Sequence, residues 1–304
     1  MKETTLTIGI PAYNEEANIV NLLKNLLAQK IDDIILDKII VISDASSDNT
    51  VQKAKDLQHT KIHIIENKTR QGKPKIQNIL FKKSNSDLLV ILDADVLPLK
   101  KNFLEKLIEP FYNNQSLGLI GAYPLSTKPK TSFEKIIADS HLFKTTMYEE
   151  INNGDNIYLC HGRARAFKKN FYKQLLIPAD CSQEDAYTYL TCKQKGFSFT
   201  FAKNAIILFT SPATLTDHAK QSARFHQGRK KLDITIFDKN IVNNVYEIPN
   251  LIFIKHLILF FIQKPFSAIS YLTIQSYLAL FNPIKQAHKG AWNVSTSTKI
   301  IDVK

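Results

Sequence analysis

Short apolar runs alternate with amphipathic helical segments four times within roughly the first hundred residues of this 304-residue chain. Each run has the length and composition of a buried strand, and each following segment repeats apolar residues at three- and four-residue spacing. The runs occupy residues 6–10, 38–43, 61–65 and 87–92. Because this alternation builds a parallel sheet with helices on both faces, we predict an α/β fold with an open, mostly parallel central sheet.

Polar residues follow these strands at the points where the strands end. Asp44 ends the second strand, a basic loop at 70–73 follows the third, and Asp93 and Asp95 follow the fourth. In open α/β sheets, ligands bind beyond the carboxyl ends of the strands. We therefore expect these residues, with the loop at 11–15, at one binding edge.

Asp93 and Asp95 are two acids one residue apart at the end of an apolar strand. On an extended backbone their side chains point the same way, and their mutual repulsion calls for a cation. Mg²⁺ and Mn²⁺ take carboxylate oxygens and keep positions open for water or phosphate. The alternative interpretation is a strand end with two solvated acids.

The order of elements loosens after residue 103. The patterns predict helices at 103–111 and 133–150, a strand entering a turn at 157–167, and a strand pair at 197–201 and 205–209. The tail from Asn282, with Trp292, carries no motif.

Charged residues mark two later helical segments. Glu184 and Asp185 stand at the start of one, where acids also complement the helix dipole without any catalytic role. Gln221 and Arg224 lie three residues apart in the basic stretch 216–231 and share one helix face. A solvated basic helix is the alternative for that stretch.

Composition narrows the partners and the compartment. A net charge of +12 favours a polyanionic partner, but no nucleic-acid recognition motif is present. Three widely spaced cysteines without a Cys-x-x-Cys pair indicate reduced thiols, and the N-terminus lacks the apolar segment of a signal peptide. We therefore expect a cytoplasmic protein that does not bind nucleic acid.

Two apolar runs, 251–262 and 266–281, lie near the C-terminus. Lys255, His256 and residues 263–265 interrupt them, so neither reaches the roughly twenty apolar residues of a membrane span. We expect amphipathic helices that lie on an anionic membrane surface. Packing against the core or a partner, and insertion into the bilayer, are the alternatives.

Six motifs, taken in order, resemble those of glycosyltransferase family 2. They are Pro11-Ala12-Tyr13-Asn14-Glu15-Glu16, Asp44-Ala45-Ser46-Ser47-Asp48-Asn49-Thr50, Gly72-Lys73 with Asn78, Asp93-Ala94-Asp95, Glu184-Asp185 and Gln221-Ser222-Ala223-Arg224-Phe225. The resemblance implies a GT-A catalytic domain at 1–231, followed at 232–304 by a helical, membrane-interfacial region. The last motif is similar to the Gln-x-x-Arg-Trp of polysaccharide synthases, but Phe225 replaces Trp and clear transmembrane helices are missing, which puts processive synthesis in doubt.

The resemblance also implies roles for these residues. Asp95 would bind the metal that bridges the diphosphate, with Asp93 nearer the nucleotide sugar, and Asp185, beside Glu184, would be the general base. The donor would be bound by Pro11, Tyr13, Glu15, Asp44, Asp48, Lys73, Gln221, Arg224 and Phe225. Asp48 has a second interpretation as a helix cap. For His161, His218 and His226 we favour structural roles over metal or phosphate binding.

The implied reaction is inverting, metal-dependent transfer of a hexosyl or N-acetylhexosaminyl group. The cofactor would be Mn²⁺ or Mg²⁺, the donor a nucleotide-diphosphate sugar with UDP-sugars favoured, and the acceptor a hydroxyl of a glycan or lipid-linked molecule on the inner face of the cell membrane. One alternative is a polyprenyl-phosphate sugar synthase. Another, of a different class, is a non-catalytic, basic membrane-binding module with a degenerate sugar-nucleotide fold.

Overall fold

The computed structural model describes residues 3–32, 34–235, 237–281, 298 and 300–301. Its strands are β1 (Thr4–Ala12), β2 (Ile34–Ser43), β3 (Ile62–Glu66), β4 (Leu88–Leu92), β5 (Val96–Pro98), β6 (Leu117–Ser126), β7 (Ala164–Lys168) and β8 (Ser198–Phe209). They form one eight-stranded sheet in the order β3-β2-β1-β4-β7-β6-β8-β5.

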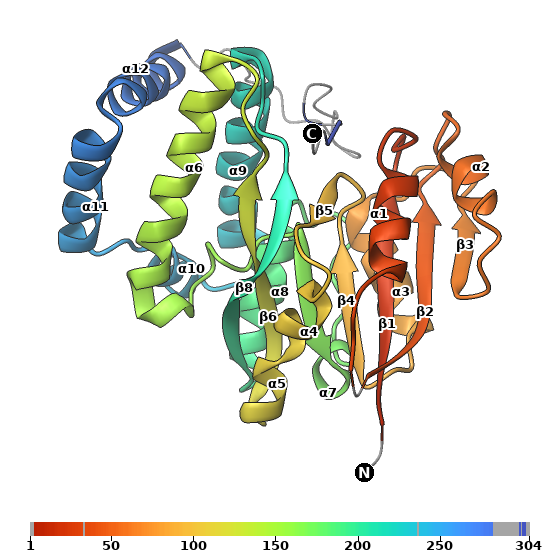
Figure 1. The fold of residues 1–304 in the computed structure, drawn as a ribbon. Helices are drawn as coiled ribbons and strands as arrows, with labels where there is room; N and C mark the ends of the chain where they lie inside the picture. The colour runs from red at the N-terminus through yellow and green to blue at the C-terminus, as the bar shows by residue number, and fades with distance from the viewer. Residues whose placement is uncertain (1–2, 33, 236, 282–297, 299, 302–304) are drawn as a thin grey trace.

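The first half of the sheet is parallel and the second half is mixed. Strands β1 to β4 pair in parallel with one another, whereas β7 runs antiparallel to both of its neighbours, β4 and β6. Strands β6 and β8 are again parallel. The carboxyl ends of β1, β2 and β4 therefore share one edge, at the top of Figure 1. This confirms the predicted α/β sheet.

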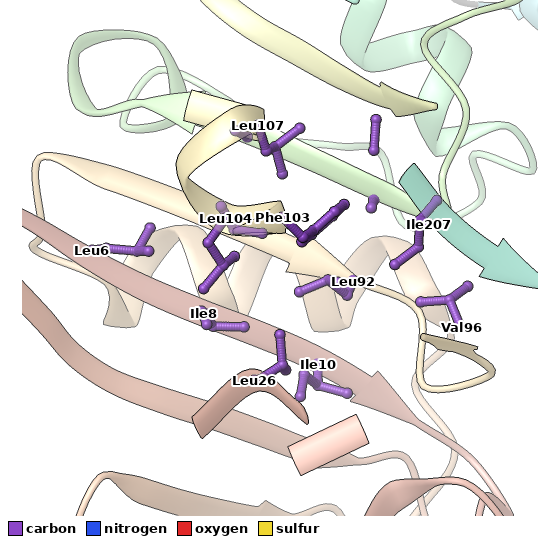
Figure 2. Packing of buried hydrophobic residues seen from close by; sticks show 14 of the residues in the cluster. Leu6, Ile8, Ile10, Leu26, Leu92, Val96, Phe103, Leu104, Leu107 and Ile207 are labelled. Carbon is purple, nitrogen blue, oxygen red and sulfur yellow. The ribbon is translucent and has the colours of Figure 1, made fainter. Parts of the chain in front are cut away.

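Helices cover both faces of the sheet. The helices are α1 (Ile19–Leu27), α2 (Thr50–Lys55), α3 (Lys73–Lys83), α4 (Phe103–Ile108), α5 (Pro110–Asn113), α6 (Ser132–Glu150), the 3₁₀ turn η1 (Ile151–Gly154), α7 (Lys169–Tyr172), α8 (Glu184–Gln194), α9 (Leu215–Thr235), α10 (Lys239–Val245), α11 (Asn250–Gln263) and α12 (Pro265–Phe281). Alternate residues of each strand feed two cores. Leu6, Ile8 and Ile10 of β1 pack with α1 and α4, as Figure 2 shows, while Leu89 and Ile91 of β4 pack with α3 and α8 on the other face.

Three local predictions are wrong. The two strands predicted at 197–201 and 205–209 form the single strand β8 (Ser198–Phe209), because a register irregularity opposite Ala122 and Tyr123 accommodates its polar middle without a turn. In the segment 157–167 the strand β7 follows the turn, since only residues from Ala164 onward find partners on β4. The helix expected at 103–111 is broken into α4 and α5, where Pro110 begins the second.

The C-terminal helices form a layer outside the sheet. Helix α6 covers the side of β6, and α11 and α12 pack on α6 at the far left of Figure 1. The predicted helices at 133–150, 251–262 and 266–281 are confirmed in α6, α11 and α12. The domain boundary predicted after residue 231 falls within α9 and stays a prediction. The tail at 282–297, with Trp292, lies outside the described residues.

Candidate functional site

An acidic cluster lies at the carboxyl edge of the sheet, where three segments meet. Asp93 and Asp95 follow β4, and Glu184 and Asp185 begin α8. Lys73, the first residue of α3, lies between the two acid pairs, with its Nζ 2.6 Å from Asp93 Oδ1 and 2.9 Å from Glu184 Oε1. The structure thus brings together five residues that the sequence predicted for the site.

Asp93 and Asp95 are not on extended backbone, as the sequence analysis assumed. Strand β4 ends at Leu92, and the two acids occupy the turn before β5. The backbone N–H of Asp93 donates to the carbonyl of Arg163 across 2.9 Å. This hydrogen bond connects the turn to the segment that precedes β7.

Glu184 and Asp185 differ in their electrostatic surroundings. Burial alone would raise the pKa of Glu184, but Lys73 and Arg165 outweigh it and lower this pKa to about 2. Burial and the charge of Glu184 raise the pKa of Asp185 above its ordinary value, against Arg165 and Lys73. Asp185 is therefore the member of the pair better suited to accept a proton.

Two backbone amides position the Asp185 carboxylate. Gly162 N–H donates to Oδ2 across 3.2 Å, and Ala186 N–H donates to Oδ1 across 2.8 Å. Each oxygen retains lone-pair capacity beyond one such bond. The carboxylate is thus oriented and still able to accept a proton.

The environment of Asp95 suits a divalent cation. Burial and the neighbouring charge of Asp93 raise the pKa of Asp95, while Lys73 and Arg163 oppose this shift. Among the described residues, no three His, Cys, Asp or Glu side chains are grouped to hold a metal. Asp95 could therefore supply one protein ligand, and a bound diphosphate and water would supply the rest, as is usual for Mg²⁺.

Arg163, which none of the predicted motifs included, lies among the acids. Burial lowers its pKa, and Asp95 and Asp93 oppose that effect. Its guanidinium carbon lies 3.9 Å from the centroid of the Phe209 ring. A cation in this place can pair with negative charge on a ligand. The signal in the sequence is the segment His161-Gly162-Arg163, which carries a basic residue directly before a strand.

His161 and His218 have structural surroundings, in line with the favoured prediction. His161 Nε2 lies 2.8 Å from the Ala122 carbonyl oxygen, and Nδ1 accepts from Arg163 N–H across 3.3 Å. Burial lowers the pKa of His161 to about 3 and that of His218 to about 4. Both rings are therefore neutral at pH 7. The side chain of His226 lies outside the described residues.

Arg165 is fully buried on β7, beneath the acidic cluster. Its Nη2 donates to Gln77 Oε1 across 3.4 Å, whereas Nε and Nη1 find no hydrogen-bond partner among the described residues. A buried guanidinium needs compensating negative charge. Arg165 lowers the pKa of Glu184 and opposes the rise in the pKa of Asp185, which indicates that these two carboxylates supply the compensating negative charge.

The residues predicted for the nucleoside pocket surround the ends of β1 and β2. Arg70 lies over the Tyr13 ring, 3.7 Å from its centroid, and Pro11 lies near the end of β1. Asp44 accepts hydrogen bonds from the backbone of Gln71 and Gly72, at 2.6 and 2.9 Å. Asp44 therefore positions the loop that leads to Lys73.

Glu15 and Asp48 bond to neighbouring protein groups. Asp48 accepts from the backbone N–H of Thr50, the first residue of α2, and of Glu16, at 3.0 and 3.1 Å, but the N-cap position is Asn49, so Asp48 is not the helix cap that the alternative interpretation expected. Glu15 is buried and accepts from Asn18 Nδ2 across 3.0 Å. These contacts give both acids a structural role beside the predicted one.

Helix α9 brings the last motif towards the same edge. Arg224 is near enough to Arg163 for its charge to lower the pKa of Arg163 further. The carbonyl of Phe225 accepts from Gln183 Nε2 across 2.7 Å, which connects α9 to the start of α8. The Phe225 side chain is exposed, and Gln221 lies one helical turn before it.

A pocket of about 550 Å³ lies between the end of β6 and α6. Its walls include Lys128, Lys130, Lys135 and His141. The His141 ring packs edge-on against Phe209, with 5.3 Å between centroids, and Arg163 lies over the same Phe209 ring. The Phe209 ring thus contacts both a residue of the pocket wall, His141, and Arg163.

The family model for glycosyl transferase family 2 matches residues 7–176, more than half of the chain. The chain belongs to glycosyltransferase family 2. This family 2 chain is 30% identical over 124 residues to the 4,4'-diaponeurosporenoate glycosyltransferase of Staphylococcus aureus strain bovine RF122 / ET3-1, a match that covers 40% of this chain. It spans about a third, 32%, of the length of that relative.

Solved structures share the fold of this glycosyltransferase. A mannosyltransferase from Pyrobaculum calidifontis, in complex with GDP-Man and Mn²⁺, aligns over 91% of this chain and 81% of its own, with a TM-score of 0.60 and 18% identity. Glucosyl-3-phosphoglycerate synthase from Mycobacterium tuberculosis, with Mn²⁺, UDP and phosphoglyceric acid, aligns over 76% of this chain and 78% of its own, with a TM-score of 0.54 and 16% identity. S. aureus TarS 1–349, in complex with UDP, aligns over 79% of this chain and 69% of its own, with a TM-score of 0.56 and 14% identity. These similarities confirm the predicted GT-A fold.

Proposed function

We propose that this family 2 enzyme transfers a sugar, with inversion, from a nucleotide-diphosphate donor to a hydroxyl of a glycan or lipid-linked acceptor. The observation that carries the proposal is the arrangement of the acidic cluster. A proton acceptor, Asp185, and a cation ligand, Asp95, lie on either side of Lys73 at one edge of the sheet. Glycosyl transfer to a hydroxyl needs both functions in one site.

Asp185 is the proposed general base. It accepts the proton of the acceptor hydroxyl as the oxygen attacks the sugar, and Glu184 stays ionised because Lys73 and Arg165 hold its pKa near 2. A general base is most effective when its pKa lies near the working pH, and a raised pKa brings a carboxylate closer to that condition. In this role Glu184 supports Asp185 and does not itself take the proton.

The leaving nucleoside diphosphate is the proposed ligand of the positive groups. Arg163, Arg224 and Lys73 lie close enough to the acids to bind the phosphate oxygens. A divalent metal, Mn²⁺ or Mg²⁺, would bind Asp95 and neutralise the charge that develops on the diphosphate. Similar structures contain Mn²⁺ or Mg²⁺ with UDP, which supports this choice and a UDP-sugar donor.

The donor's nucleoside would lie over the ends of β1 and β2. Tyr13 and Asp44 are the proposed contacts there, with Pro11, Glu15 and Asp48 forming the wall. Asp93, whose Oδ1 is bonded to Lys73, would lie nearer the nucleotide sugar. The sugar transferred would be a hexosyl or N-acetylhexosaminyl group.

The acceptor would enter past α9, where Gln221 and Phe225 lie. We place the reaction in the cytoplasm, on the inner face of the cell membrane, with the product used in glycan or polysaccharide synthesis. Support comes from three cysteines that are free thiols and from the apolar C-terminal helices.

The test is donor hydrolysis and transfer with UDP-, GDP- and dTDP-sugars, with Mn²⁺ or Mg²⁺ and a lipid extract as acceptor. We expect metal-dependent release of one nucleotide, lost with EDTA and reduced by about 10²–10⁴-fold in Asp95→Ala and Asp185→Asn. Asp32→Asn, an exposed acid between α1 and β2, is the matched control and keeps full activity. Equal activity in all three variants would refute the proposed site, and no release from any donor would refute the enzyme.

A further inference from the structure

Helices α11 and α12 direct their polar side chains towards the protein. Lys255 Nζ and His256 Nε2 lie 2.9 and 2.8 Å from Glu150 carboxylate oxygens, and Ser267 donates to Asp139 across 2.6 Å. Glu150 and Asp139 both belong to α6. These contacts fix the orientation of α11 and α12 on α6.

Further inward contacts continue along the same side. Gln275 Nε2 lies 3.1 Å from His218 Nε2, and Lys144 of α6 lies 5.0 Å from the Tyr271 ring centroid. Phe260 is the only large apolar side chain of α11 that is fully buried, and in α12 the buried residues are Ser267 and Ala268. The face that meets the protein thus combines these polar and small residues with Phe260 and with half-buried apolar side chains such as Ile252, Leu257 and Ile274.

The opposite face of the two helices is apolar. Its most exposed members are Leu251 (83%), Leu280 (78%), Ile262 (72%) and Phe266 (69%). The set, named here the docking face, consists of Leu251, Phe253, Ile254, Ile258, Leu259, Phe261, Ile262, Phe266, Ile269, Leu272, Tyr277, Leu280 and Phe281. A surface helix in water has the reverse arrangement, with its apolar stripe on the core. A contiguous apolar face of this extent indicates contact with another apolar phase or surface.

The charges on these helices have one sign. No Asp or Glu occurs between residues 250 and 281, and the charged residues there are Lys255 and Lys264. Lys264 is exposed at the junction of α11 and α12, beside the docking face. An apolar face bordered by lysine without acids complements an anionic lipid surface.

Within the described residues, neither regular helix reaches the roughly twenty residues of a typical bilayer span. Helix α11 has 14 residues and α12 has 17, which at about 1.5 Å per residue gives roughly 21 and 25 Å, below the ~30 Å of a hydrocarbon core. The stretch Lys239–Gln263 has the length and apolarity of a span, with 6% of its most apolar window buried. Within it, however, α10 ends at Val245 and α11 begins only at Asn250.

We infer that the docking face binds the surface of an anionic bilayer, with its apolar side chains in the headgroup region and α11 and α12 parallel to the membrane plane. The lysine-lined pocket between β6 and α6 lies next to the inward side of α12, because Asp139 both borders the pocket and accepts a hydrogen bond from the buried Ser267 of α12. A lipid-linked acceptor could therefore reach the site from the bilayer. The access of a lipid-linked acceptor rests on the proposed function, whereas the binding of the docking face to the membrane does not.

The experiment is co-sedimentation of the full chain with phosphatidylcholine vesicles, with and without phosphatidylglycerol. We expect binding to the anionic vesicles that weakens in high salt. Ile262→Glu and Leu280→Glu each weaken binding about tenfold or more. Each variant removes an apolar side chain that enters the bilayer and places a negative charge next to anionic lipid. Leu176→Glu is the matched control, since Leu176 is 74% exposed outside the docking face, and it keeps normal binding. Lys264→Glu weakens binding, and exposed Lys195→Glu does not.

Three results would overturn the inference. The first is absence of binding to anionic vesicles. The second is a concentration-dependent dimer that Ile262→Glu dissociates, which would assign the docking face to a second copy. The third is resistance of the bound protein to alkaline carbonate, which would indicate a span. Metal-dependent donor hydrolysis, measured without vesicles, stays unchanged in every variant, so failure of docking and failure of the proposed enzyme give different results.

Discussion

Lys73 Nζ and Asp93 Oδ1 lie 2.6 Å apart, so the first residue of α3 is paired with the residue that follows β4. Burial alone would lower the pKa of Lys73, but Asp93 and Glu184 outweigh it and raise this pKa above its ordinary value. Lys73 therefore stays charged. Its charge holds together two acid pairs that would otherwise repel each other.

Replacement of Lys73 by Met should impair catalysis and shift its pH dependence. We expect kcat/KM to fall about 100-fold, equivalent to about 2.7 kcal/mol. Lys73 lowers the pKa of Asp185, so its removal raises that pKa, and the acidic limb of the kcat profile moves to higher pH. Lys83→Met, an exposed lysine at the end of the same helix, is the control. If the acidic limb of the kcat profile stays at the same pH in Lys73→Met, Lys73 does not control the pKa of Asp185.

Asp44→Asn should affect donor affinity more than turnover. The carboxylate accepts from the backbone N–H groups of Gln71 and Gly72, and Gly72 has a φ of +83°, a conformation that glycine adopts readily, so both bonds hold this turn of the loop. Charge-assisted hydrogen bonds contribute about 1.5–3 kcal/mol. We expect the KM for the donor to rise about tenfold while kcat changes less than about twofold. Asp56→Asn, exposed at the end of α2, serves as control, and a proportional loss of kcat would show that Asp44 acts on the reacting groups.

Gly121→Ala should destabilise the fold. Gly121 lies on β6, and a Cβ there would collide with the carbonyl oxygen of Leu159 and contact the Phe199 ring. Since a backbone atom cannot move aside cheaply, we expect a loss of about 2–3 kcal/mol in the free energy of unfolding, measured in urea. Gly196→Ala meets no atom within 4 Å and costs only the strain of its φ of +78°, about 1 kcal/mol. Equal losses of unfolding free energy in Gly121→Ala and Gly196→Ala would contradict the close approach of the Leu159 carbonyl to Gly121.

Buried neutral histidines should make the protein sensitive to mild acid. Burial lowers the pKa of His161 to about 3 and of His218 to about 4, and it also lowers that of His141. Below pH 6.5 the unfolded chain binds protons that the folded chain does not, so the free energy of unfolding falls as pH drops from 6.5 towards 4. Each histidine contributes up to about 1.4 kcal/mol per pH unit.

His161→Gln should reduce this slope, as measured by urea unfolding at several pH values. His63→Gln, at an exposed position on β3, should leave it unchanged. If His161→Gln retains the full slope, the imidazole is not buried in its neutral form.

Much of the fold could be predicted from the sequence because its first half obeys local rules. Strand β4 is apolar throughout and β2 is apolar from Ile39 to Ile42, and the acids after both strands mark the binding edge directly. Helix α6 begins with a complete capping box of Thr131 and Glu134 and ends where its periodicity ends. These signals need no tertiary information.

The remaining features depend on contacts between distant segments. Strand β5 is three residues long and exists because it pairs with β8, more than a hundred residues later. Arg165 lies between two alanines of β7, and this alternation predicts a solvent-exposed side chain. In the structure the side chain is buried and bonds to Gln77. The basic residue before β7 is visible in the sequence, but its place among the acids is not, because that place depends on the hydrogen bond that the Asp93 N–H donates to the Arg163 carbonyl.

Helix α6 lies between α11 and the sheet. Figure 1 shows α11, α6 and the sheet side by side in that order, and helix layers stand about 10 Å apart. A bilayer bound to α11 would therefore lie roughly 20 Å from the nearest strand. An acceptor whose hydroxyl sits at its lipid anchor would fall short of Asp185, whereas a longer one would reach it. The two helix layers would thus select acceptors by length, whichever sugar is transferred.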